Sequence, residues 1–376
     1  MAATTGSPGA EAFARALDKL EGATSAPVLS ASFDLRPDGN GTPVAPRILR
    51  EALRTADDGS LRLDTESLAE GLGATLREAA SAGLPGLFVA GPLDDPVRLV
   101  SLVPIPPRNH LSVGEAPSRF ELERYRALTR IPVAVAWADR SRVAWTLVRG
   151  DAEPIEGHLD ADPHFMRGSL GRTGQHDRGG PVGSPSGGHS KTRIEESAEE
   201  ARDHFARDVA ERLVPDVRPA EIVIVHGPEE FRARLIAELP QQIRDRIEAA
   251  DEPEREPTGD DLVTEARERA VGAQFDRAAR EAEAIMTGAL GERAALDASA
   301  IGEASTQGRL EQLILHEEAV SHFGTALDAR RHETDHDEAL IEGLLREALS
   351  QSATCWFAHA DQLDSAPDGA IGSLRW

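Results

Sequence analysis

Cysteine is almost absent from this sequence of 376 residues, in which Cys355 is the only one. A single cysteine excludes an intramolecular disulfide, so the fold must be stable without a covalent cross-link. Such a chain is typical of a reducing compartment, and we expect a cytoplasmic protein. Cys355 lies beside Trp356 and Phe357 in an apolar run, which predicts an inert thiol in the core.

Lysine is scarce as well. Lys19 and Lys191 are the only two lysines, so arginine supplies nearly all the positive charge of a chain with a formal net charge of -24. Strong acidity with few lysines is typical of a halophile or a high-GC genome, and we interpret the acidic surface as an adaptation to salt. Such a surface argues against DNA as a partner and against nucleic-acid binding over the whole surface, but it permits binding through one local basic patch.

Long apolar runs, targeting segments and cofactor motifs are missing too. No stretch reaches the roughly 20 apolar residues that a membrane span requires, and residues 1–11 have neither the basic nor the hydrophobic region of a secretory signal. The sequence contains no Walker loop and no dinucleotide-binding fingerprint. We therefore expect no membrane partner and no cofactor.

One stretch has a metal-like composition, the six residues from His332 to Asp337. Two histidines four residues apart converge on a metal only when they lie on a helix, whereas this stretch precedes the predicted helix Asp337–Ser350. We interpret it as a linker and helix N-terminus, with Asp335 or Asp337 as the cap, and predict no metal site. His226 directly follows a buried strand and is expected to be a core histidine.

The feature that stands out is a basic, glycine-rich segment at residues 164–193. It contains five basic residues and one acid, Asp177, a net charge of +4 within an acidic chain. The five basic residues are Arg167, Arg172, Arg178, Lys191 and Arg193. A locally basic loop on an acidic body is suited to meet phosphate oxygens, most commonly those of nucleic acid.

Apolar patterning predicts an α/β protein, because helical and strand-like segments alternate along the chain. The predicted helices with both ends defined are 10–20, 67–82, 262–286 and 337–350. Two more helices are predicted to begin at Pro46 and at Glu229. A further helix is predicted from apolar residues that recur every three or four positions, namely Ile194, Ala198, Ala201, Phe205, Val209 and Leu213. The predicted strands are 28–35, 87–90, 97–103, 133–137, 143–148, 222–225, 310–316 and 354–358. Acids and prolines cluster at 249–260, which predicts a linker.

Within the basic segment, Gly187-Gly188-His189-Ser190-Lys191-Thr192-Arg193 runs into the predicted helix with Glu195-Glu196 and Ala201-Arg202-Asp203-His204-Phe205. This stretch resembles the Gly-Gly-Gln loop and following helix of class-1 release factors of the archaeal and eukaryotic type. In that family the loop enters the ribosomal peptidyl-transferase centre, where the glutamine coordinates the hydrolysis of peptidyl-tRNA. In this chain His189 stands at the glutamine position.

Two further motifs extend the resemblance to both ends of the chain. Residues 32–37, Ser-Phe-Asp-Leu-Arg-Pro, look like the N-terminal strand of bacterial and archaeal release-factor-like proteins, and residues 368–376 resemble the closing strand of that family and of Pelota. The resemblance implies three domains. These are an N-terminal α/β domain at 1–130, an RNase H-like middle domain at 131–250 with the loop 164–193, and a C-terminal α/β sandwich at 258–376 like kink-turn-binding ribosomal proteins.

The resemblance implies a cytoplasmic translation factor that binds the ribosome. The Asn-Ile-Lys-Ser decoding element of true release factors is absent, so stop-codon reading is not expected. Relatives without an intact Gly-Gly-Gln, such as the hibernation factor Balon, sit in the vacant tRNA site, and we therefore expect a hibernation or rescue factor in the aminoacyl-tRNA site. Implied partners are the ribosome and its RNA, with tRNA or an elongation-type GTPase as further candidates.

The predicted site residues have two roles. Gly187, Gly188, His189 and Ser190 form the loop tip, where adjacent glycines permit a close backbone approach to RNA or an ester. The five basic residues of the segment contact ribosomal RNA phosphates. An alternative stays open: His189 as the catalytic residue of a peptidyl-tRNA hydrolase, because a neutral imidazole can orient or deprotonate water. A third possibility is a non-ribosomal protein that retained the fold.

Overall fold

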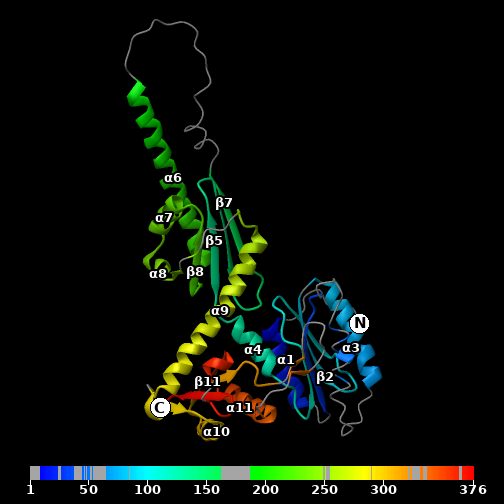
Figure 1. The fold of residues 1–376 in the computed structure, drawn as a ribbon. Coiled ribbons are helices and arrows are strands. Elements are labelled where there is room, and N and C mark those ends of the chain that lie inside the picture. Colours follow the sequence, from blue (N-terminus) through cyan, green and yellow to red (C-terminus); the bar gives the residue numbers. More distant parts are fainter. Residues whose placement is uncertain are drawn as a thin grey trace. The chain divides into compact units, whose positions relative to one another are not determined.

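The computed structural model is a mixed α/β structure with several sheets, which confirms the predicted fold class (Figure 1). It describes residues 9–23, 27–37, 45, 47, 49–50, 53, 65–83, 85–161, 187–248, 250, 255–288, 290–320, 322–323, 331–332, 337–363 and 366–376. The chain forms two compact units, one of residues 1–130 with 271–376 and the other of residues 131–270. The three-domain division at 1–130, 131–250 and 258–376 stays a prediction.

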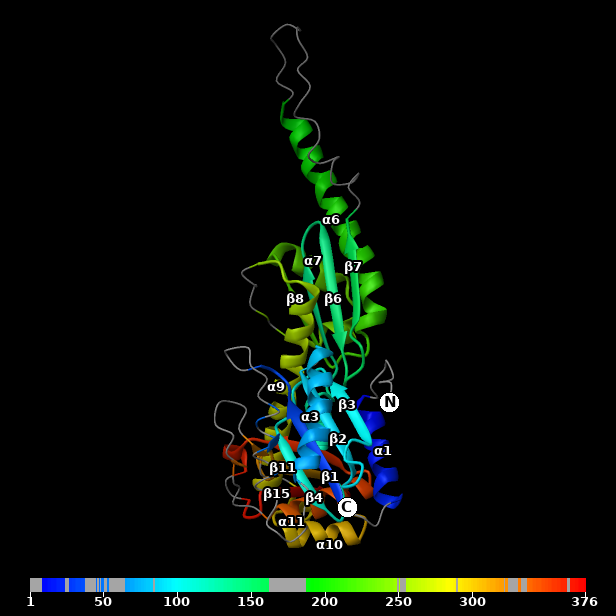
Figure 2. The same ribbon diagram turned by 90° about the vertical axis from the view of Figure 1, so that its right-hand side faces the viewer.

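The N-terminal section is built on a four-stranded antiparallel sheet in the order β3-β2-β1-β4 (Figure 2). Its strands are β1 (Val28–Asp34), β2 (Gly86–Pro92), β3 (Leu99–Val103) and β4 (His110–Gly114). Its helices are α1 (Ala10–Ala23), α3 (Thr65–Ser81) and α4 (Phe120–Leu128). The central strand β1 is buried along its whole length, because helices cover both faces of the sheet.

Alternation along β1 decides which helix each side chain meets. Leu29 and Phe33 point to the face where α3 packs through Leu72 and Leu76. On the opposite face, Phe88 of β2 contacts Phe13 of α1 and the ring of Tyr125 of α4, with ring centroids 6.0 and 5.6 Å apart. The predicted strand 28–35 is confirmed within one residue, and the predicted helix 10–20 has its predicted start and ends three residues later.

The C-terminal section holds a second four-stranded sheet in the order β10-β15-β11-β14. Its strands are β10 (Ala294–Ala295), β11 (Leu310–His316), β14 (Thr354–Ala358) and β15 (Ala370–Leu374), and the pair β11–β14 is parallel. Helices α10 (Ala298–Thr306) and α11 (Glu338–Ser350) cover one face. The C-terminal half of α9 (Gly259–Met286) covers the other. A separate two-stranded sheet pairs β12 (His322–Phe323) with β13 (Arg331–His332).

One carboxylate of α11 caps helix α4. The side chain of Glu342 accepts hydrogen bonds from the backbone N–H of Arg119 at 3.1 Å and of Phe120 at 3.2 Å, and from the hydroxyl of Ser118. Helix α4 has no side-chain cap of its own, so residues from the far end of the chain satisfy its free N–H groups. This contact joins the N-terminal and C-terminal sections within one unit.

A second charged contact also joins these two sections. Glu317 lies 2.7 Å from Arg108 and 3.5 Å from Arg124, measured between carboxylate oxygen and guanidinium nitrogen. Burial alone would raise the pKa of Glu317, but the charges of Arg108 and Arg124 outweigh burial and hold that pKa below its usual range. The carboxylate is therefore ionised and fixes both arginines.

Cys355 is buried on β14 with 2% of its surface exposed. Burial raises the pKa of its thiol to about 12, so almost no thiolate exists at neutral pH, and the predicted inert core thiol agrees with this position. We expect iodoacetamide at about pH 8 to leave the native protein unlabelled and to label the chain fully in guanidinium chloride, because the thiolate is the nucleophile. Rapid labelling of the native protein would contradict the packing of β14.

The second unit contains a five-stranded sheet in the order β7-β6-β5-β8-β9. Its strands are β5 (Val133–Ala138), β6 (Arg142–Val148), β7 (Ile155–Asp160), β8 (Ile222–His226) and β9 (Ile247–Glu248). The first three form an antiparallel meander, and β5, β8 and β9 are parallel. Helices α6 (Gly187–Val217), α7 (Glu229–Glu238) and α8 (Gln241–Arg244) connect the last strands.

Candidate functional site

The candidate site is carried by α6, the helix that follows the basic segment. Helix α6 has 31 residues, a length of about 46 Å at 1.5 Å per residue. Only its C-terminal half packs on the sheet, where a stripe of side chains is buried. These are Phe205, Ala206, Val209, Ala210, Leu213 and Val217. Figures 1 and 2 both show the N-terminal half extending past the end of the sheet.

The structure corrects one boundary here. The sequence predicts a loop that continues to Arg193, whereas the backbone is already helical at Gly187. No proline stands between Gly187 and Pro215, and most of the intervening residues are good helix formers. The two glycines are weak helix formers at the very end of the helix, where their cost is smallest.

Ion pairs with α7 hold the packed half of α6. Arg202 of α6 lies 3.1 Å from Glu230, and Arg207 lies 3.6 Å from Glu238. In the reverse direction, Arg234 of α7 hydrogen-bonds Asp203. The aromatic rings of Phe205 and Phe231 stack between the two helices with centroids 5.5 Å apart. The base of α6 is therefore tied to its neighbour by both polar and apolar contacts.

A tryptophan anchors the C-terminal end of α6 to the sheet. The indole N–H of Trp145, on β6, donates a hydrogen bond to the carboxylate of Asp216 at 2.9 Å. The ring lies against Gly157 of β7, so closely that a Cβ on Gly157 would stand 2.2 Å from ring carbons. Only glycine leaves room for the ring, and the contact sets the direction in which α6 leaves the sheet. No sequence pattern predicts this contact, because Trp145, Gly157 and Asp216 are separated along the chain and meet only in three dimensions.

Gly157→Ala should therefore loosen the base of α6. The added methyl group displaces the Trp145 ring and breaks its hydrogen bond to Asp216, so we expect a loss of about 2–3 kcal/mol in the free energy of unfolding, measured by urea denaturation. Gly71→Ala is the control, because a Cβ there meets nothing within 4 Å and alanine is the better helix former. Equal stability of the two variants would refute the anchoring role.

The predicted site residues are placed unequally. Gly187, Gly188, His189, Ser190, Lys191 and Arg193 fall in the first two turns of α6, and the structure describes their backbone alone. Arg167, Arg172 and Arg178 lie outside the described residues. The roles of all nine residues therefore stay predictions. The structure adds that the Gly-Gly-His sequence stands at the N-terminus of a helix whose C-terminal half is anchored.

The family comparison bears on this same unit. Residues 133–294 match the family model described as "Bacterial archaeo-eukaryotic release factor family 2". This part of the chain is release-factor-like. The match includes the sheet β7-β6-β5-β8-β9, the whole of α6 and the Gly-Gly-His sequence, and it confirms the resemblance predicted from the residues. No curated protein matches the chain.

Solved structures of release-factor-like proteins are also similar to the chain. An archaeal translation termination factor, aRF1, is 14% identical, with 98% of this chain and 99% of that chain covered and a TM-score of 0.25. Pelota from Archaeoglobus fulgidus is 15% identical, with 71% and 72% covered and a TM-score of 0.35. Dom34 from S. cerevisiae is 11% identical, with 77% and 80% covered and a TM-score of 0.38. All three TM-scores are under 0.5, so the identification comes from the family model over residues 133–294.

Other polar groups of the described chain have structural roles. Buried His226 bonds Glu265 of α9 at 2.7 Å through Nε2, as expected for a core histidine. Asp337 caps α11 by accepting from the N–H groups of Ala339 and Leu340, which confirms one of the two predicted caps. Among the described residues, no group of three or more His, Cys, Asp or Glu side chains is placed to hold a metal. None of the described helices combines the length and apolar character needed to cross a bilayer.

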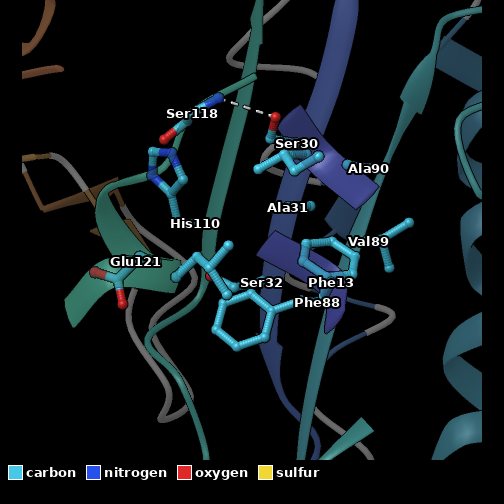
Figure 3. Close-up of a pocket in the computed structure, with 12 residues that line it drawn as sticks. Phe13, Ser30, Ala31, Ser32, Phe88, Val89, Ala90, His110, Ser118 and Glu121 are labelled. Atoms are coloured by element: carbon cyan, nitrogen blue, oxygen red, sulfur yellow. Dashed lines mark hydrogen bonds between the residues drawn. The ribbon is translucent and has the colours of Figure 1, made fainter. Parts of the chain in front are cut away.

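A small cavity lies between α1, α4 and the N-terminal sheet (Figure 3). Its polar side chains are Ser30, Ser32, His110, Ser118 and Glu121, and the backbone N–H of Ser118 donates to the Ser30 hydroxyl at 3.0 Å. The volume of about 20 Å³ is that of a single water site. The cavity is too small for a substrate, so it does not compete with α6 as the functional site.

A charged groove of about 700 Å³ lies between α1, α4 and α11. Arg119 pairs there with Asp18 at 2.6 Å and with Glu21 at 2.7 Å, while Arg126 pairs with Glu11 and Glu123. These guanidinium groups are compensated by carboxylates within the groove itself. The groove therefore shows no preference for a ligand of either charge.

Proposed function

We propose that the chain is a ribosome-binding translation factor that occupies the aminoacyl-tRNA site as a hibernation or rescue factor. The observation that carries this proposal is the match of residues 133–294 to a release-factor model together with the basic segment that leads into α6. The segment has a net charge of +4 in a chain of -24, and the helix N-terminus adds a positive dipole end. Both features favour ribosomal RNA phosphates.

The geometry of α6 supports delivery of the Gly-Gly-His sequence into a narrow site. A helix of about 46 Å anchored at its C-terminal half by Trp145, Asp216 and the α7 ion pairs can carry its N-terminal end well away from the sheet. The strand order β7-β6-β5-β8-β9, a meander joined to parallel strands, supports the RNase H-like middle domain implied by the resemblance. A ribosomal role also accounts for the expected cytoplasmic location.

We propose occupancy rather than hydrolysis because His189 stands where release factors have glutamine. Glutamine acts by positioning water, and histidine differs from it in shape and in hydrogen-bond pattern. The retained Gly-Gly pair keeps peptidyl-tRNA hydrolysis by His189 as the alternative. An elongation-type GTPase and tRNA stay proposed partners on the resemblance alone.

Occupancy of the aminoacyl-tRNA site can be tested by competition. Purified ribosomes with a vacant site, and ribosomes with the site filled by aminoacyl-tRNA, are sedimented with the purified protein through a sucrose cushion. We expect the protein to pellet with vacant ribosomes and to be excluded from filled ones. The assay is repeated over a range of salt, because screening weakens electrostatic contacts. Equal binding to both ribosome preparations would place the protein elsewhere on the ribosome.

A further inference from the structure

Strand β7 leaves one edge of the five-stranded sheet open. It is the first strand in the order β7-β6-β5-β8-β9 and lies beside β6 (Figure 2). The backbone N–H of Ala161 donates to the carbonyl oxygen of Ser141 at 2.8 Å, which continues the antiparallel register of β6 and β7. Hydrogen-bonded and non-hydrogen-bonded pairs alternate along such a ladder. The backbone N–H and C=O groups of Glu156, His158 and Asp160 therefore point away from β6.

The outward backbone groups of these three residues have no hydrogen-bond partner in the part of the chain that the structure describes. Edge strand β14 of the C-terminal section shows the contrast, because side chains satisfy its outer carbonyl groups. Arg130 donates to the carbonyl oxygen of Cys355 at 3.0 Å, and Gln274 donates to that of Phe357 at 2.9 Å. An unpaired strand edge is a template for pairing with a further strand, so β7 offers a backbone binding surface that β14 does not.

The open edge is acidic. Residues 151–160 contain no lysine or arginine, and their acids are Asp151, Glu153, Glu156 and Asp160. Among the described residues, the ion pair that strand β7 forms is the one between Asp160 and Arg142, at 3.6 Å. Arg142 also lies 3.6 Å from Glu256, so its one positive charge is shared between two carboxylates. A cationic partner would meet an excess of negative charge along this strand.

We infer that the open edge of β7 binds an extended, arginine- or lysine-rich segment of a partner protein, which adds a sixth strand to the five-stranded sheet. In this mode of recognition the main-chain hydrogen bonds provide affinity and the side chains provide specificity. A second copy of this chain fits the edge badly, because two paired β7 strands would bring like charges together. The inference goes beyond the proposed function, and its test needs no ribosome, so it can fail while the ribosomal function stands.

The test compares two fluorescent peptides of the same charge, whose binding to the full chain is followed by anisotropy. The first is an extended peptide of about nine residues in which arginine and valine alternate. The second has the same sequence with a methyl group on every peptide nitrogen, so it keeps its charge but cannot donate to a strand edge. We expect the methylated peptide to bind at least about tenfold more weakly. Equal binding of the two peptides would show charge attraction alone and overturn the inference.

His158 locates the binding on β7. Proline at this position removes the outward N–H and leaves the hydrogen bonds to β6 in place, as edge strands tolerate. We expect His158→Pro to weaken binding of the unmethylated peptide at least about fivefold, and His158→Ala, which keeps the N–H, to change it less than about twofold. Urea unfolding at the wild-type midpoint verifies the fold of each variant, and if His158→Pro fails to fold, the two peptides decide the matter on the wild type. Equal binding by folded His158→Pro and His158→Ala would overturn the inference.

A pair of charge variants tests the preference for a basic partner. Glu153→Gln with Glu156→Gln should weaken binding of the unmethylated peptide at least about fivefold. Glu78→Gln with Glu211→Gln removes the same charge from exposed positions away from β7 and should change it less than about twofold. Equal losses in the two double variants would assign the attraction to the acidic chain as a whole and overturn the inference.

Two other occupants of the edge give distinct results. A dimer seen in sedimentation equilibrium that His158→Pro dissociates would make a second copy the occupant. A preference for the unmethylated peptide that appears only after Arg172, Arg178, Lys191 and Arg193 are replaced by Ala would make the basic segment at 164–193 the occupant. Either result would overturn the assignment to a partner protein.

Discussion

Ribosome association should be almost abolished when Arg172, Arg178, Lys191 and Arg193 are replaced together by Ala. These residues supply four of the five positive charges in the segment 164–193, and each cation that meets a phosphate releases condensed counterions. Removing four such contacts should lower affinity at least about 100-fold and reduce the slope of log affinity against log salt by roughly 3. Co-sedimentation with purified ribosomes at several salt concentrations measures both quantities.

The matched control removes the same charge elsewhere. Arg77, Arg98, Arg149 and Arg218 are exposed and lie outside the segment. Replacing these four by Ala should leave most of the ribosome binding intact, because nonspecific attraction to a body of net charge -24 is weak. If both four-residue variants bind ribosomes as the wild type does, the segment has no part in ribosome binding.

Glu342→Ala should destabilise the unit formed by residues 1–130 and 271–376 by about 2–4 kcal/mol. The substitution leaves the N–H groups of Arg119 and Phe120 and the hydroxyl of Ser118 without their acceptor. Helix α4 has no side-chain cap to replace it, and its first residue, Phe120, is fully buried. Urea unfolding followed by circular dichroism measures the loss.

Glu347→Ala provides the comparison for this effect. Glu347 is exposed on the same helix α11, so its replacement tests the loss of a carboxylate without the loss of the cap. We expect a change of no more than about 0.5 kcal/mol. The rate at which Cys355 becomes labelled in intermediate urea should rise for Glu342→Ala and stay unchanged for Glu347→Ala. A similar small effect of both substitutions would show that the cap contributes little.

The sequence predicts best the elements whose apolar pattern is continuous. Strands 310–316 and 354–358 are found with those bounds as β11 and β14. Each contains a buried run of consecutive apolar residues, Leu313–Leu315 in β11 and Cys355–Ala358 in β14. Helix α4 escapes prediction for the opposite reason. Eight of its nine residues are buried, and Glu121, Glu123 and Arg124 are among them. Glu121 pairs with Arg124 and Glu123 with Arg126 inside the helix, and Arg124 also pairs with Glu317 of the C-terminal section. An apolar pattern does not reveal a helix whose charged side chains are buried in this way.

Edge strands and the ends of helices are also poorly predicted from the sequence. Strand β7 is the edge strand beside β6 in this sheet and is largely exposed, so it lacks the alternation that marks a half-buried strand. The apolar pattern predicts a helix from Ile194, seven residues after the observed start of α6 at Gly187, because residues 187–193 contain no apolar side chain. The candidate site itself was predicted from the Gly-Gly-His sequence and its charge, whereas the Trp145 anchor became visible only in three dimensions.

The most direct test of the account is single-turnover release of labelled peptide from peptidyl-tRNA on ribosomes, measured for the wild type and for His189→Ala. Both proteins are first shown to bind, since one neutral side chain adds little beside five cationic contacts. Occupancy without chemistry predicts that both proteins pellet with ribosomes and that neither releases peptide above the rate without protein. Fast release by the wild type that disappears with His189→Ala would contradict this account and establish a hydrolase.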